Sequence, residues 1–175
     1  MHSRIFQISR EKPIEKDDYL DEDDLYPCDY CSSAFVGNVA DYVSAFGDAD
    51  KDEIEWLKSA YGIDGGLEVN AENRTITIVN KEVYFKNKFD KLKELTDRLN
   101  SLSLSQFSLT ALGEDAEHRD CSFYTIRYEI DELLNGDKWG MYFYEDGCYD
   151  TVDEVIRGCA NGEVLYIGQV FDYHS

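Results

Sequence analysis

The sequence predicts an α+β fold with a largely antiparallel or mixed sheet and about four helices. Apolar residues recur at helical spacing in some segments and alternate in others, so both helices and strands are expected. The two kinds of element come in runs, without regular βαβ alternation and without an internal repeat. With 175 residues, 43% hydrophobic, the chain can bury a core, and residues 1–175 are expected to form a single compact domain.

The first part of the chain is expected to hold one strand and two helices. The partly alternating run 2–9 predicts an opening strand. After an acidic segment, apolar residues at steps of three and four predict a helix over 33–46, with Gly47 as a plausible C-cap. A further helix is expected to begin at Asp50, which can cap it, and to stop at Gly62.

A hairpin and a long helix are expected next. Residues 67–70 and 74–79 are rich in β-branched residues and flank a short run of turn residues, a pattern typical of two paired strands. Residues 81–102 carry apolar side chains at helical spacing, and Asn80 can cap that helix. This helix has a small excess of positive charge, which a solvated helix face explains without nucleic acid.

The last part of the chain is expected to be mainly β. Aromatic-rich segments predict three strands, 107–112, 122–130 and 139–144. Thr151 and Glu154 form a capping box for a short helix, on whose apolar stripe Cys159 is expected to be buried. Residues 163–171 are expected to form the closing strand.

The acidic segment, residues 11–31, raises the main functional question. It combines a cluster of carboxylates with a Cys-x-x-Cys motif at Cys28 and Cys31. The clustered acids are Asp17, Asp18, Asp21, Glu22, Asp23 and Asp24. They could bind a metal, form a solvated surface beside a zinc or redox motif, or imitate the charge of a nucleic acid.

Cys28 and Cys31 are weak candidates for a metal or dithiol site. Their spacing suits half of a zinc site, but the remaining cysteines and His118 are not spaced as a second half. Nearby acids such as Asp29 would raise the thiol pKa values and suppress the reactive thiolate. Ordinary reduced cysteines are therefore favoured, and an odd total of five fits a reducing compartment.

Other catalytic signals are sparse. His118 lies in a polar stretch and could serve as a general base, whereas His2 and His174 lie at the ends of the sequence. The start of an EF-hand-like pattern at Asp48 lacks the glycine and the final carboxylate that calcium binding needs. No nucleotide-binding or nucleophile-elbow motif is present. The sequence favours a non-enzymatic protein without a cofactor.

The charge balance limits the possible partners. Thirty-seven acids against 17 bases give a net charge of −20, which opposes direct binding to nucleic acid or to an anionic membrane. Most of the excess lies in residues 11–55, with 15 acids and three bases, and 114–157, with 13 acids and four bases. The natural partner is a cationic surface, and proteins that hold DNA or RNA carry the strongest of these.

In composition, the chain resembles the acidic DNA-mimicking inhibitors of mobile elements, the antirestriction and anti-CRISPR proteins. The resemblance covers the whole chain and includes no diagnostic motif. It implies inhibition of a basic nucleic-acid-handling protein, such as a CRISPR nuclease or restriction enzyme, by occupation of its groove. Two alternatives remain, a small metal-dependent or redox enzyme that uses Cys28 and Cys31 or the His118 loop, and an acidic adaptor with an unrelated partner.

Tyrosines lie among the acids, and this mixture suits a protein-binding surface. The alternative is that Tyr142 and Tyr144 belong to a strand with one face in the core. The predicted partner-binding residues are Asp17, Asp18, Asp21, Glu22, Asp23, Asp24, Tyr26, Glu145, Asp146 and Asp150. With no apolar run of about 20 residues and no signal-peptide pattern, the protein is expected to be cytoplasmic.

Overall fold

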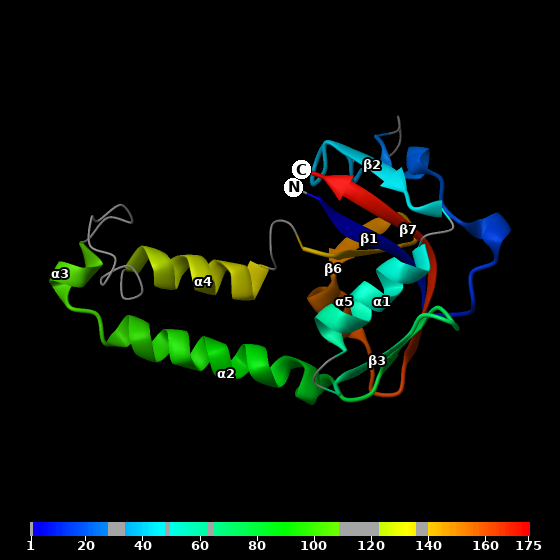
Figure 1. The fold of residues 1–175 in the computed structure, drawn as a ribbon. Coiled ribbons are helices and arrows are strands. Elements are labelled where there is room, and N and C mark those ends of the chain that lie inside the picture. The colour runs from blue at the N-terminus through cyan, green and yellow to red at the C-terminus, as the bar shows by residue number, and fades with distance from the viewer. Residues whose placement is uncertain (1, 28–33, 48–49, 63–64, 109–122, 136–139) are drawn as a thin grey trace. The chain divides into compact units, whose positions relative to one another are not determined.

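The computed structural model describes residues 2–27, 34–47, 50–62, 65–108, 123–135 and 140–175. The chain divides into two compact units, the first comprising Met1–Tyr84 with Trp139–Ser175 and the second Phe85–Lys138. The described residues form five α-helices and a seven-stranded mixed sheet, which confirms the α+β class (Figure 1). The single compact domain stays a prediction.

The sheet lies in the first unit. Its strand order is β3–β4–β7–β1–β5–β6, and β2 also pairs with β7. The β1–β5 pair is parallel, whereas the remaining described pairs are antiparallel. The bounds are β1 His2–Ser9, β2 Tyr42–Ala45, β3 Leu67–Asn70, β4 Thr75–Ile78, β5 Tyr142–Glu145, β6 Cys148–Thr151 and β7 Val164–His174.

Strand β7 organises the sheet because it pairs along both edges. Strand β1 follows one edge, while β4 and β2 share the other. Five apolar side chains of β7 are at most 2% exposed: Leu165, Ile167, Val170, Phe171 and Tyr173. The predicted strand 163–171 is confirmed, but it continues to His174, where it pairs with both β1 and β2.

Most of the predicted helices and strands are confirmed in the first unit. The opening strand is β1, and the predicted hairpin is β3 with β4. Helix α1, Asp50–Tyr61, buries Ile54 and Leu57 and contacts β3. Helix α5, Val152–Gly158, begins after Thr151, whose Oγ1 accepts a hydrogen bond from the backbone N–H of Glu154 at 3.3 Å.

The predicted long helix and its cap are also confirmed. Helix α2 spans Lys81–Asn100 and ends two residues before the predicted end. Asn80 Oδ1 accepts hydrogen bonds from the backbone N–H groups of Glu82 and Val83, at 3.0 and 3.2 Å. These bonds satisfy two of the donors that a helix N-terminus leaves without intrahelical partners.

The predicted helix over 33–46 is wrong. The described part of this segment forms a turn closed by a bridge between Val36 and Ala40, followed by strand β2. Gly37 has a φ of +91°, which is incompatible with a continuing right-handed helix. Because β2 pairs with β7 and buries Val43 in the core, sheet pairing outweighed the helical spacing of the apolar residues.

The predicted strand over 122–130 is also wrong. Its described part belongs to helix α4, Phe123–Asn135, in the second unit. Ile126 is 1% exposed, and Glu129 forms an ion pair with Arg98 of α2 at 3.2 Å. The aromatic and β-branched residues favoured a strand, but the segment forms a helix that contacts helix α2.

Two further predicted strands need correction. Phe107 ends the short helix α3, Leu104–Phe107, capped by Ser103, while residues 109–112 lie outside the described residues. The strand predicted over 139–144 begins later, as β5. Strand β6 was not predicted. It follows a tight turn at Asp146 and Gly147, whose φ angles are +49° and +82°, and this Asp-Gly pair was the overlooked hairpin signal.

A core cluster lies around the C-terminal half of β7. The Phe35 ring packs edge-on against the rings of Tyr142, Tyr149 and Tyr173, with centroid separations of 5.1–5.3 Å. Leu25, which is fully buried, joins this cluster from the acidic segment. The acidic segment is therefore anchored to the sheet.

Candidate functional site

The described part of the acidic segment, residues 11–27, contains two short 3₁₀ turns, η1 at Lys16–Asp18 and η2 at Glu22–Leu25. Leu25 fixes its far end, because the side chain is in the core and the carbonyl accepts a hydrogen bond from Val36 N–H at 2.9 Å. Leu20 packs against the same cluster. The segment can therefore present its charged side chains from a defined backbone.

Gln7 on β1 ties the middle of the segment to the sheet. Its Nε2 donates to the carbonyl of Asp18 at 3.0 Å, and its Oε1 accepts from Leu20 N–H at 3.1 Å. The same Oε1 accepts from Gln169 N–H at 2.9 Å. Because Gln7 is only 9% exposed, its side-chain amide has little access to water, and these hydrogen bonds take the place of bonds to water.

A β-bulge makes room for Gln7. Phe6 pairs with Val170 and Ile8 with Ile167, so two residues of β7 face one residue of β1. One of the two is Gly168, and a Cβ there would lie 2.4 Å from Gln7 Oε1. A larger residue at this position would force the side chain of Gln7 or Ile14 to move.

Arg74 holds the other side of the bulge. Its Nε donates to the carbonyl of Ile167 at 3.1 Å, and its guanidinium also bonds the carbonyl of Gly168. The same guanidinium lies 2.8 Å from a carboxylate oxygen of Asp50 and 5.3 Å from the ring centre of Tyr19 in the acidic segment. Arg74 therefore connects the bulge, the start of α1 and the acidic segment.

The six clustered carboxylates are exposed. Two of their side chains also hold the local backbone. Glu22 Oε1 accepts from Ala45 N–H of β2 at 2.8 Å, and Asp24 Oδ2 accepts from Asp21 N–H at 2.9 Å. No ion pair joins the acids of residues 11–27 to another described residue.

The arginines of the first unit pair with acids outside the segment. Arg4 pairs with Glu53 and Asp172, Arg10 with Glu145 and Glu163, Arg74 with Asp50, and Arg157 with Glu154. Partly buried acids therefore have compensating charges, while the eight acids of residues 11–27 have only Lys12 and Lys16 within their own segment. Residues 11–27 therefore carry a local net charge of −6, from eight acids and two lysines.

The other predicted binding residues differ in their surroundings. Glu145 is half-buried, and its Oε2 lies 2.9 Å from Arg10 Nε, so its charge is compensated. Asp146 and Asp150 are exposed on the β5–β6 hairpin, and Tyr26 is 37% exposed at the end of η2. The sequence grouped Glu145 with the other acids because it does not reveal the contact between Glu145 and Arg10.

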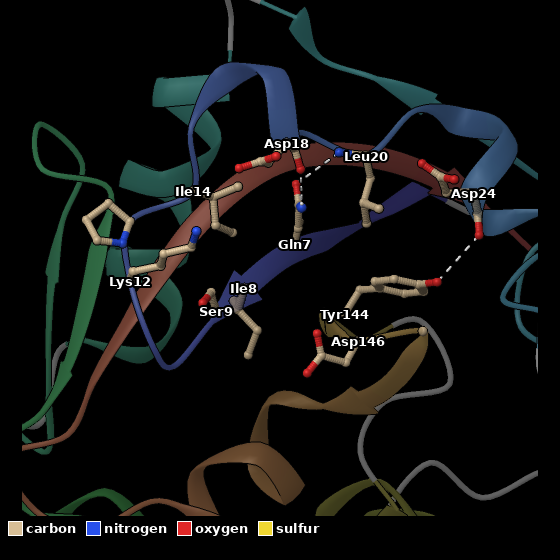
Figure 2. A pocket seen from close by; sticks show the side chains of 12 residues that line it. Gln7, Ile8, Ser9, Lys12, Ile14, Asp18, Leu20, Asp24, Tyr144 and Asp146 are labelled. Carbon is tan, nitrogen blue, oxygen red and sulfur yellow. Dashed lines mark hydrogen bonds between the residues drawn. The ribbon is translucent and has the colours of Figure 1, made fainter.

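A pocket of about 400 Å³ lies beside the acidic segment in the first unit. Figure 2 shows Ile14 and Leu20 on one side of it, Tyr144 and Asp146 on the other, and Gln7 between them on β1. The full lining is Gln7, Ile8, Ser9, Lys12, Pro13, Ile14, Asp18, Leu20, Asp24, Tyr144, Asp146 and Gly147. Three predicted partner-binding residues, Asp18, Asp24 and Asp146, thus line one cavity.

Tyr144 links the hairpin to the acidic segment. Its hydroxyl lies 3.5 Å from the backbone oxygen of Asp24. Partial burial raises the pKa of the Tyr144 phenol, and the nearby negative charge of Asp24 raises it further. Tyr142 and Tyr149 instead contact the Phe35 ring, so the tyrosines of this hairpin divide between the core and the pocket.

The candidate metal and catalytic residues Cys28, Cys31 and His118 lie outside the described residues. Within the described ranges, no group of three or more His, Cys, Asp or Glu residues could hold a metal ion. Cys159 is 1% exposed, as predicted for a core cysteine.

Sequence reasoning missed a cluster of rings where strands β1, β7 and β2 lie side by side. Figure 1 shows the ends of β1 and β7 next to each other. The rings of His2 and His174 are 5.2 Å apart, and Tyr42 stacks on His174 at 5.5 Å. His2 Nδ1 lies 2.6 Å from Asp172, and His174 Nδ1 lies 3.4 Å from Asp41. Only the pairing of the first and last strands could have indicated this cluster.

The geometry defines an α+β protein with an anchored acidic surface segment and an adjoining pocket. Comparison of the chain with known family models, curated proteins and solved structures found no match. Among the described helices, none has the length and apolar character needed to cross a lipid bilayer.

Proposed function

We propose that this protein is a cytoplasmic, non-enzymatic inhibitor that occupies the nucleic-acid groove of a basic protein, such as a CRISPR nuclease or a restriction enzyme. The observation that carries the proposal is the described part of the acidic segment, residues 11–27, whose eight acids lack ion pairs with other described residues while the backbone is fixed by Gln7 and Leu25. This arrangement favours intermolecular pairing over intramolecular pairing.

The physical basis is electrostatic. Duplex DNA presents about one negative charge per 1.7 Å of axis, so a groove that binds DNA carries many lysines and arginines. Carboxylates on an anchored segment can meet such a groove without first ordering the backbone that holds them, which lowers the entropic cost of binding. Opposite potentials also accelerate association.

The test begins with a basic target identified by pull-down and confirmed with purified proteins. Binding is expected to weaken as salt rises from low to moderate concentration, because screening acts beyond about 8 Å at 0.15 M. The protein is expected to compete with DNA or RNA for the target and to inhibit it stoichiometrically.

Charge variants locate the surface. Replacing Asp17, Asp18 and Asp23 with Asn should weaken binding and reduce its salt dependence, while stability changes by less than about 0.5 kcal/mol. The control replaces three other exposed acids without a described ion pair, Glu68, Asp97 and Glu132, by the corresponding amides. It removes the same charge and should leave binding nearly unchanged.

Three results would contradict the proposal. Equal weakening by both triple variants would mean that only net charge matters. A target that holds this protein and nucleic acid together, with neither affinity reduced, would indicate an adaptor. Turnover of a substrate by catalytic amounts would indicate an enzyme.

A further inference from the structure

We propose that the pocket beside the acidic segment receives one cationic side chain, the guanidinium of an arginine or the ammonium of a lysine, from the basic partner. This inference rests on the proposed function and assigns a specific contact to it. This contact would fix the position of the partner, which the other acidic residues would attract without fixing its position.

The pocket is large enough for a side chain, and its walls are held in place by the fold. Its volume of about 400 Å³ is within the roughly 300–1,000 Å³ of ordinary ligand pockets. Gln7 fixes the wall formed by the acidic segment through the bonds to Asp18 and Leu20. The opposite wall belongs to the β5–β6 hairpin, which is held by strand pairing. The binding surfaces are therefore formed before a ligand arrives.

The lining matches both parts of a cationic side chain. Ile8, Ile14 and Leu20 offer apolar surface for the methylene stem of a lysine or arginine. Tyr144 presents an aromatic ring, which attracts a cation through its face. Acidic residues line both sides of the pocket, Asp18 and Asp24 from the segment and Asp146 from the hairpin, so the charged end would meet negative charge on either side.

Other ligand classes fit less well. An anion would approach three carboxylates, whereas Lys12 is the single base among the lining residues, all of which the structure describes. A metal ion needs convergent ligands, and the acids of this pocket do not form such a group. Carboxylates spread around a partly apolar cavity suit an extended organic cation.

Lys12 provides a sharp test because its charge opposes the proposed ligand. It lines the pocket, is exposed, and forms no ion pair with a described residue. Its replacement by Met retains a flexible apolar chain and removes the charge. Lys12→Met is therefore expected to tighten binding of a cation, an outcome that damage to the fold would not produce.

The experiment titrates the full chain with three probes, N-acetylarginine amide, N-acetyllysine amide and uncharged N-acetylnorleucine amide, and follows the Tyr144 ring signals by NMR. The charged probes should shift these signals and the uncharged probe should not. Asp146→Asn should weaken binding and Lys12→Met should tighten it, each by about two- to fivefold, the effect of one partly exposed charge pair. The matched controls outside the pocket, Asp23→Asn and Lys16→Met, should change binding less than the pocket variants.

The arginine and lysine probes distinguish the two sources of the cation by their relative affinities. Equal binding of the uncharged probe, shifts away from Tyr144, or equal effects of the pocket and control variants would overturn the proposed pocket. Competition with DNA, measured separately on the basic target, tests the proposed function. Competition without pocket selectivity refutes only the pocket contact, whereas pocket selectivity without competition refutes the groove-blocking function.

Discussion

Replacement of Gln7 by Leu is expected to destabilise the protein and release the middle of the acidic segment. The change removes three hydrogen bonds, to Asp18, Leu20 and Gln169. Gln169 is 9% exposed, so its N–H would remain buried without a partner at a cost of about 1–3 kcal/mol. The groups of the acidic segment can regain water, so each of their two bonds contributes about 0.5 kcal/mol, the low end for a hydrogen bond, or about 1 kcal/mol together.

The expected loss in the free energy of unfolding is therefore about 2–4 kcal/mol, measured by urea denaturation. For a chain of this size, such a loss lowers Tm by roughly 4–16 °C. Hydrogen exchange gives a local measurement, because the Leu20 N–H should lose protection once its acceptor is absent.

A double-mutant cycle with Gly168→Ala tests whether the bulge acts through Gln7. In the native background the added Cβ would lie 2.4 Å from Gln7 Oε1 and 2.7 Å from Cδ, so Gly168→Ala should destabilise strongly. After Gln7→Ala, the clash with the amide is gone and Gly168→Ala should cost less. Additivity within about 0.5 kcal/mol would show that the bulge does not act through Gln7. Unchanged protection of the Leu20 N–H in Gln7→Leu would show that the Gln7 amide does not hold the acidic segment.

Two further predictions concern titratable groups. Burial, followed by the negative charge of Asp153, raises the Tyr84 pKa well above 10. The unfolded chain therefore loses this proton first, and stability should fall as pH rises above about 10. Urea unfolding at pH 7 and 11 should show a smaller fall in the free energy of unfolding for Tyr84→Phe than for the native protein. This variant also lacks the 2.7 Å hydrogen bond to Asp153. Equal falls in the two proteins would contradict the assignment to Tyr84. In a variant with Cys28, Cys31 and Cys121 changed to Ser, a thiol-reactive disulfide reagent should label exposed Cys148 rapidly, and Cys159 only after unfolding. Burial and then Glu163 raise the Cys159 pKa and disfavour its thiolate, so rapid labelling of both thiols in the folded protein would contradict the buried position.

Local signals in the sequence were sufficient for several elements. Asn80 and Thr151 identified helix starts because a side-chain cap acts within three residues. Alternation of apolar residues identified β1 and the β3–β4 hairpin. The same local reasoning failed for 33–46 and 122–130, where the deciding partners, β7 and α2, are distant in sequence.

For the candidate site, the excess of acid and its concentration near the N-terminus could be predicted from the sequence, because charge follows from composition. Which of those charges are compensated, and where a cavity forms, could be known only from the folded chain. Arg10 pairs with Glu145 from 135 positions away, and Gln7 meets Gln169 from 162 away. Such contacts arise from strand pairing and a bulge, and each depends on the fold of the whole first unit. No spacing within the acidic segment could have encoded them.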